Sequence, residues 1–174
     1  TLSQWRRATY CTAMAERNRN HISLFCEMQE QEDKPYAKCL SKTWAYLEGE
    51  LKSLDNLERF FNEFDQWQNS LLDNQESFGA EAAQQACQSL YSATYALLDE
   101  SANDCELVQL SNKQLLVEFT EMGNDSEDLI ARQEQFEIQV FELLTSGKPK
   151  RETILSIKKL ASSEPESSLG ISLD

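Results

Sequence analysis

Glycine and proline are scarce in this chain of 174 residues, which contains five glycines and three prolines. These two residue types interrupt helices and form the tight turns that connect strands. Because an all-β fold needs many such turns, the composition disfavours one. The sequence instead favours long helices that are joined by short connections.

Histidine is rarer still, since His21 is the only one. A single histidine excludes zinc sites with two histidines and di-metal bundles that need a Glu-x-x-His motif on two helices. Glycine-rich phosphate loops are also missing. We therefore predict no catalytic residue, no metal and no cofactor, and favour a protein that is not an enzyme. His21 itself stands at a helix start, where we interpret it as a surface or capping residue.

The five cysteines do not form a ligand or disulfide pattern, because they are odd in number, widely spaced and without a Cys-x-x-Cys motif. This arrangement is typical of free, mostly packed thiols in a reducing compartment. No apolar run is long enough to span a bilayer, and the start lacks a signal-like segment. We expect a cytoplasmic protein with no membrane partner. Redox sensing is a lesser alternative that thiol reactivity would test.

Negative charge dominates, with 30 acids against 16 bases and a formal net charge of −14. Such a field repels phosphate, so we expect no nucleic-acid partner. The charge is uneven: residues 1–52 carry eight bases and seven acids, whereas residues 53–146 carry three bases and nineteen acids. Solvated helix faces are the ordinary explanation for the acidic middle. A surface for a basic partner and mimicry of nucleic acid are the alternatives.

Apolar residues recur every three to four positions along most of the chain, while no segment alternates as a strand does. We predict an all-α fold: a single-domain bundle of seven or eight helices, mostly antiparallel neighbours, with an extended C-terminal tail. The helical domain covers 1–162 and the tail covers 163–174. Alternating Leu169, Ile171 and Leu173 suggest that this tail docks on the bundle as a strap.

Helix boundaries are predicted from capping residues and breakers. The third apolar stripe runs from Tyr36 to Leu54, and Asp55 with Glu58 resembles a capping box for the next helix. Gly123 and Gly147 stand where a left-handed C-terminal cap needs glycine.

In the fourth helix, four aromatic residues cover more than one side. The ordinary interpretation is a helix central to the core, and the alternative is a face that meets a second subunit. These residues are Phe60, Phe61, Phe64 and Trp67.

Several segments together resemble one known family. They are AERNRNHISLFCE (15–27), YAKCLSKTWAYLEGEL (36–51), LERFFNEF (57–64), AAQQACQSL (82–90) and SSLGISL (167–173). The pattern is similar to the YjaG-like family of uncharacterised bacterial proteins, a domain of unknown function, and extends over essentially the whole chain. The resemblance implies an all-helical cytoplasmic protein without a known activity, cofactor or active-site residue.

The sequence carries no signature of a particular activity and leaves two hypotheses open. The first is a non-enzymatic helical module that binds a protein, possibly as a homodimer, through an apolar helix face with acidic surroundings. The second is a small-molecule-binding protein or unassigned enzyme with a pocket between helices. The candidate binding residues are Glu16, Arg17 and His21. A pocket lined by Arg17, His21 or Trp44 would favour the second hypothesis.

Overall fold

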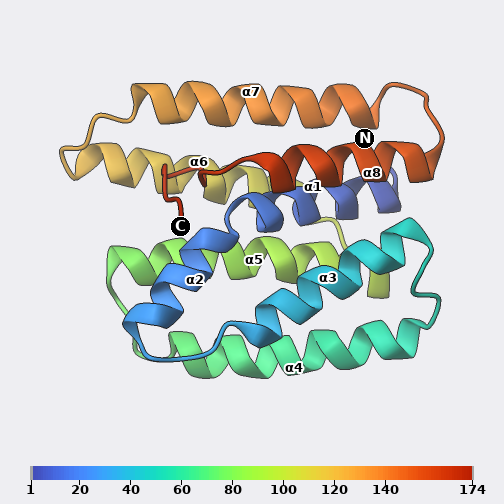
Figure 1. The fold of residues 1–174 in the computed structure, drawn as a ribbon, viewed down its shortest axis with the longest axis horizontal. Helices are drawn as coiled ribbons and strands as arrows, with labels where there is room; N and C mark the ends of the chain where they lie inside the picture. The colour runs from blue at the N-terminus through green and yellow to red at the C-terminus, as the bar shows by residue number, and fades with distance from the viewer. Residues whose placement is uncertain (1, 174) are drawn as a thin grey trace.

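The computed structural model describes residues 2–173, which form eight helices and no strand (Figure 1). The predicted all-α class and the number of helices are therefore confirmed for these residues. The helices are α1 (Gln4–Arg17), α2 (Arg19–Met28), α3 (Lys34–Glu48), α4 (Leu54–Leu72), α5 (Phe78–Leu98), α6 (Cys105–Glu121), α7 (Glu127–Leu144) and α8 (Lys150–Ser163).

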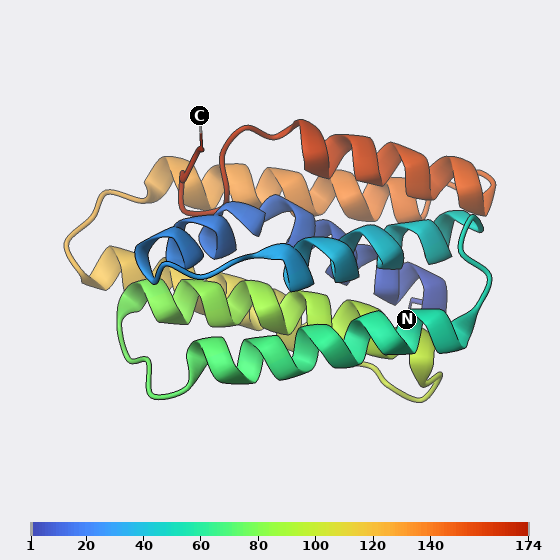
Figure 2. The same cartoon turned by 60° about the horizontal axis from the view of Figure 1, so that its bottom comes forward.

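Helix α1 lies at the centre of the molecule, while α4 and α7 lie at opposite edges (Figures 1 and 2). Its most extensive contact is with α5, and it also packs against α2, α3, α6, α7 and α8. Small side chains allow the two central helices to approach closely. Those with no exposed surface are Ala8, Ala13 and Ala15 in α1 and Ala83, Ala86 and Ala93 in α5. One cluster of buried apolar residues reaches all eight helices.

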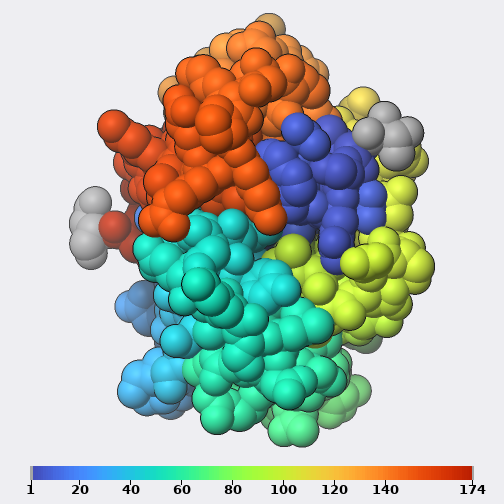
Figure 3. All heavy atoms as spheres, turned by 90° about the vertical axis from the view of Figure 1, so that its right-hand side faces the viewer, coloured from blue at the N-terminus to red at the C-terminus, as the bar shows by residue number. Residues whose placement is uncertain are grey.

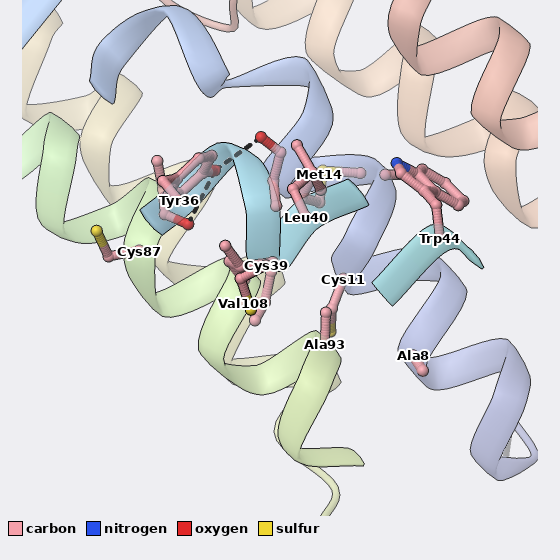
Figure 4. Close-up of a cluster of buried hydrophobic side chains, with 14 of the residues drawn as sticks. Ala8, Cys11, Met14, Tyr36, Cys39, Leu40, Trp44, Cys87, Ala93 and Val108 are labelled. Carbon is pink, nitrogen blue, oxygen red and sulfur yellow. Dashed lines mark hydrogen bonds between the residues drawn. The ribbon is translucent and has the colours of Figure 1, made fainter. Parts of the chain in front are cut away.

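Buried side chains of α1, α3 and α5 form a cluster in the core, and Trp44 is the largest of them (Figure 4). The Tyr36 hydroxyl donates to the backbone carbonyl oxygens of Ala15 at 2.8 Å and Ala86 at 3.4 Å. Because a buried hydroxyl without a partner is costly, these bonds fix Tyr36 in the core. Burial raises the pKa of Tyr36 well above its ordinary value. Trp44 and Met14 fill the neighbouring space.

The aromatic face of α4 is turned inward. Phe61 and Phe64 are buried, and the rings of Phe64 and Tyr36 are 6.0 Å apart in an edge-on arrangement. Phe60 is half-buried, and the cationic groups of Lys42 and Arg59 lie 5.1 Å from its ring. The ordinary interpretation of this aromatic run, as part of the core of the chain itself, therefore fits the structure.

Two helix boundaries differ from the prediction. Helix α3 ends at Glu48 rather than at Leu54, because Gly49 adopts a left-handed conformation with φ +84° and closes the helix. Helix α4 begins at Leu54, where the Ser53 hydroxyl accepts from the backbone N–H of Asn56 at 3.1 Å. The predicted cap at Asp55 is therefore wrong by two positions.

Residues 164–173 follow α8 without helix or strand and cross the junction of α1 and α2 (Figure 2). We call these residues the C-terminal segment. A tight turn closes within it: the backbone N–H of Ser167 donates to the carbonyl of Ile171 at 3.0 Å. Leu169 is 7% exposed and packs in a small apolar cluster with residues of α5, α6 and α7, whereas Leu173 is 43% exposed.

Candidate functional site

The three candidate residues do not share one site. Arg17 and His21 lie beneath the C-terminal segment, where they are 4% and 2% exposed. Glu16 faces a separate cleft beside Trp44. Residues one and five positions apart on helices can point in different directions, and the break at Asn18 turns the chain between them.

Arg17 joins α1 to α7. Its Nε donates to Oε1 of the buried Gln133 at 2.8 Å, and its guanidinium carbon lies 4.8 Å from the centre of the Phe136 ring. One terminal nitrogen is 3.6 Å from a carboxylate oxygen of Glu164. Burial lowers the pKa of Arg17 from its ordinary value. The guanidinium thus holds parts of the chain together and has little surface left for a ligand.

Asn18 is the most highly connected polar side chain at this junction and is fully buried. Its amide nitrogen donates to Gln85 at 3.1 Å and to Asn112 at 2.9 Å. Its amide oxygen accepts from the backbone N–H of Ser168 at 2.9 Å. One side chain therefore connects α1, α5, α6 and the C-terminal segment. The sequence pattern shows Asn18 only as a helix break and carries no signal for these distant partners.

His21 is buried, so its predicted place at the surface or as a cap is wrong. Its Nε2 lies 2.8 Å from the hydroxyl of Ser167. That hydroxyl oxygen accepts from the backbone N–H groups of Leu169 and Ile171, both at 3.2 Å. Because that oxygen already accepts two N–H groups, the Ser167 hydroxyl is positioned to donate its own proton to Nε2. Burial lowers the pKa of His21 to about 4, so the ring is neutral at pH 7.

These residues, together with Asn20, form what we call the α1–α2 corner. The amide nitrogen of Asn20 donates to the carbonyl oxygen of Ile171 at 2.9 Å. Each of the four residues thus has a polar contact with the C-terminal segment of the same chain, although Nδ1 of His21 has no hydrogen-bond partner. Arg17 and His21 are positioned to hold this segment, and nothing in their geometry supplies a nucleophile or a metal site.

Glu16 lines a cleft of about 270 Å³ whose other walls come from α2, α3 and α8. Its carboxylate accepts from Nε1 of Trp44 at 3.2 Å and pairs with Arg19 at 3.1 Å. Lys158, on the α8 wall, pairs with the buried Glu48 at 3.0 Å. The cleft therefore has polar walls, but its charged groups already have partners.

A second concave surface lies between α6 and α7, with a volume of about 360 Å³. We call it the α6–α7 groove. Its apolar walls come from Leu110, Leu116 and Val117 of α6 and Ile130 of α7. Leu110 is 62% exposed and Val117 is 39% exposed. Large apolar side chains that are exposed together are typical of a surface that binds another molecule.

Further apolar side chains extend this surface along the same helix faces. Leu107 stands three positions before Leu110, and Ile138 stands four positions after Glu134, so each lies beside a groove residue. Both are 51% exposed. The sequence shows these residues as an unusually broad apolar stripe, but periodicity alone does not tell which side of a broad stripe is covered.

Carboxylates accompany the apolar walls. Glu134 and Glu137 line the groove on the α7 side. The carboxylate of Glu137 is half-buried and accepts from the Tyr10 hydroxyl at 3.1 Å and from Gln133 at 3.4 Å. Burial raises the pKa of Glu137 despite these hydrogen bonds. Residues 105–144 carry nine acids and two bases, so the groove lies in a strongly negative part of the molecule.

The chain itself fills one end of the space between α6 and α7. Leu169 packs there against Leu115 and Leu116, and Ile171 packs against the same cluster. Leu116 and Ile130 belong both to this cluster and to the α6–α7 groove. The α6–α7 groove is therefore the open end of the same space between the two helices that, at its other end, holds Leu169 and Ile171.

Residues 2–173 include no membrane-length apolar helix and no cluster of metal-binding side chains. No helix in this range is both long and apolar enough to cross a membrane. No three side chains of histidine, cysteine, aspartate or glutamate gather there in an arrangement that would hold a metal ion.

The fold and these surfaces define an all-helical protein with a buried polar junction and an open acidic groove. The chain belongs to the DUF416 family, described as proteins of unknown function, whose model matches residues 1–172. An uncharacterised protein of Haemophilus influenzae is 30% identical over 193 aligned positions, which cover 98% of this chain and 92% of that protein. No solved structure matches the chain with significance. The narrower YjaG-like name stays a prediction.

Proposed function

We propose that this protein is a helical interaction module whose α6–α7 groove binds a basic amphipathic helix of a partner protein. The observation that carries the proposal is the exposed apolar wall of Leu107, Leu110 and Val117 beside the carboxylates of Glu134 and Glu137. A helix that lies in a groove contributes apolar residues at three- and four-residue spacing on one face. The wall of α6 offers the complementary apolar surface.

The packing at the closed end supports an apolar occupant. There, Leu169 and Ile171 occupy the space between α6 and α7 and share Leu116 and Ile130 with the groove. A leucine or isoleucine of a partner could contact the same two side chains from the open end. Burial of one such side chain contributes about 2 kcal/mol, so several anchors, together with charge pairs, are needed to offset the cost of association and reach micromolar affinity.

Charge favours a basic partner over a second copy of this chain. The surroundings of the groove carry nine acids and two bases, and the whole chain has a net charge of −14. Two such surfaces repel each other, whereas lysine or arginine beside the apolar face of a partner helix would pair with Glu134 and Glu137. A homodimer through this groove is therefore one of the outcomes that the experiment must separate.

The test uses a fluorescent peptide of about 18 residues with leucines on one helical face and lysines on the other. Fluorescence anisotropy with the full chain should give micromolar binding that weakens with salt. Leu110→Asp should weaken binding by at least about tenfold, because Leu110 lies at the centre of the apolar wall. Leu155→Asp is the matched control: Leu155 is 41% exposed on α8, and the change adds the same charge.

Three results would overturn the proposal. Equal affinity for a peptide in which glutamates replace the lysines would show that the carboxylates of the groove do not contribute to binding. Equal weakening by Leu110→Asp and Leu155→Asp would show that the groove is not the binding surface. A dimer in sedimentation experiments that only Leu110→Asp dissociates would show that a second copy occupies the groove.

The cleft beside Glu16 carries a second candidate function, the binding of a small molecule. Trp44 lines this cleft with Glu16, Arg19, Asp33 and Lys158, so both signs of charge are present, as a zwitterion such as an amino acid requires. Calorimetric titration with the twenty amino acids tests it. Heat of binding that Glu16→Gln abolishes would support it, and no heat with any of them would reject it. The α6–α7 groove is the stronger candidate, because Leu110 and Val117 of its apolar walls are exposed.

A further inference from the structure

Glu137 and Glu134 both line the α6–α7 groove, but they differ in exposure and in contacts. The Glu134 side chain is exposed, whereas the Glu137 side chain is half-buried. Helix α1 packs against both α6 and α7, and its first residues lie between the α7–α8 and α5–α6 connections (Figure 3). The fully buried Tyr10 of α1 therefore reaches Glu137 from inside the molecule.

The two hydrogen bonds of the Glu137 carboxylate end on the same oxygen. The Tyr10 hydroxyl donates to Oε1 at 3.1 Å, and Nε2 of Gln133 donates to it at 3.4 Å. Gln133 is buried, and the orientation of its amide is fixed because its own Oε1 accepts from Arg17 at 2.8 Å. A carboxylate oxygen accepts about two hydrogen bonds, so Oε1 is saturated and Oε2 is the oxygen left for a ligand.

The chain supplies no cation for this carboxylate. No lysine, arginine or histidine within residues 2–173 forms an ion pair with Glu137. Two other carboxylates that are shielded from water each have such a partner. Glu48 pairs with Lys158 at 3.0 Å, and Glu16 pairs with Arg19 at 3.1 Å. Glu137 is therefore a shielded acid whose counter-charge has to come from another molecule.

The surroundings of Glu137 disfavour its charge as long as the groove is empty. Burial raises the pKa of Glu137, and hydrogen bonds from Gln133, Tyr10 and Gln109 offset this effect only in part. Lys113 lines the groove from α6, but its side chain is exposed. A cation placed within a few ångströms of the carboxylate would stabilise its ionised form.

One free oxygen favours lysine over arginine as the source of this cation. A guanidinium binds a carboxylate best through two parallel N–H···O bonds, which need both oxygens. A lysine ammonium is a compact charge that one oxygen can hold. Leu110 and Glu137 line the same groove, so the carbon chain of a lysine can cover the apolar wall while its ammonium reaches Oε2.

We propose that Glu137 is the specificity-determining residue of the α6–α7 groove and selects a partner helix with one lysine inside its apolar face. The ammonium of this lysine donates to Oε2 of Glu137. The exposed Glu134 contributes only to the general attraction of a basic partner. This specificity rests on the function proposed for the groove and adds the feature by which the groove distinguishes one basic helix from another.

The test compares three fluorescent peptides that share leucines on one helical face and lysines on the other. They differ at one position of the leucine face, which holds lysine, arginine or norleucine, an unbranched apolar residue. This position is moved through each leucine in turn, so that no register is assumed. In fluorescence anisotropy, the full chain should bind the best lysine peptide at least about tenfold more tightly than its norleucine counterpart. The arginine peptide should bind at least about threefold more weakly than the lysine peptide.

Glu137→Gln removes the charge and keeps the shape of the side chain. In this variant the lysine and norleucine peptides should bind with affinities that agree within about twofold. Glu134→Gln is the matched control, because it removes the same charge from the same helix one turn away. It should change the preference for lysine by less than about twofold. Circular dichroism and urea unfolding check that both variants fold.

The outcomes separate this specificity from the function of the groove. Suppose that the peptides bind in a way that Leu110→Asp weakens, but lysine gives no advantage over norleucine or keeps its advantage in Glu137→Gln. The role of Glu137 is then wrong, while the groove still binds a basic helix. An arginine peptide that binds as tightly as the lysine peptide would overturn the selection of lysine by one free oxygen. If no peptide binds, the function of the groove and the role of Glu137 are both wrong.

Discussion

The two ends of the space between α6 and α7 differ in what fills them. At the closed end, Leu169 and Ile171 cover the apolar walls, and the α1–α2 corner binds the backbone of the same segment. At the open end, Leu110 and Val117 remain exposed beside Glu134 and Glu137. Apolar walls of the same two helices therefore stabilise the fold where the chain covers them and are available for contact where it does not.

Asn18→Ala should have the largest effect, because it breaks the closed end at its most connected side chain. The change leaves polar groups of Gln85, Asn112 and Ser168 buried without this partner, at about 1–3 kcal/mol each, so we expect a loss of about 4 kcal/mol. Urea unfolding measures it. Asn62→Ala, at an exposed position of α4, should change the free energy of unfolding by less than about 0.5 kcal/mol.

Lowering the pH should destabilise the folded chain, because protonation of the buried His21 is unfavourable at the closed end. The folded chain keeps this ring neutral with a pKa of about 4, whereas the unfolded chain takes up the proton near pH 6.5. The contribution of His21 is therefore complete above pH 6.5 and is lost as the pH falls towards 4, a difference of about 3 kcal/mol. Unfolding at several pH values should show a shallower dependence for His21→Gln, and identical slopes for both proteins would contradict the assignment.

Leu169→Ala should destabilise the fold by emptying part of the closed end. We expect a loss of about 2–3 kcal/mol, since the side chain is 7% exposed and packs against Leu115 and Leu116. Leu173→Ala is its control four positions later, where the side chain is 43% exposed, and should cost less than about 0.5 kcal/mol. Similar losses in both variants would mean that the segment does not dock as described.

Leu110→Asp should have the smallest effect on stability, because a residue that is 62% exposed contributes little to the core. The free energy of unfolding should change by less than about 0.5 kcal/mol, while binding of the basic peptide weakens at least about tenfold. A loss of 2 kcal/mol or more in urea unfolding would show that this wall of α6 supports the fold instead of serving contact.

Much of the fold follows from apolar spacing and turn residues. The all-α class, the seven or eight helices and the end of α6 beside Gly123 were predictable because each depends on residues within a few positions. Helix α7, in contrast, ends at Leu144, three residues before the predicted cap at Gly147. The two wrong boundaries, at Gly49 and Ser53, are also errors of a few residues. They arose because the apolar spacing continues across the short loop that separates α3 from α4.

The site was much less predictable. Glu16, Arg17 and His21 are close in sequence, yet their environments depend on Trp44, Gln133 and Ser167, which are up to 146 residues away. A lone histidine at a helix start gives no sign that a distant serine covers it. The α6–α7 groove was also missed, because a broad apolar stripe looks the same in sequence whether a neighbour covers all of it or only half.

The bond between Asn18 and Ser168 joins positions 150 residues apart in the chain. During synthesis from the N-terminus, α1 and α2 leave the ribosome long before the segment that completes their junction exists. Their amide and imidazole groups must therefore stay hydrated until residues 164–173 have been translated, and the final cooperative step of folding waits for this segment to leave the ribosome.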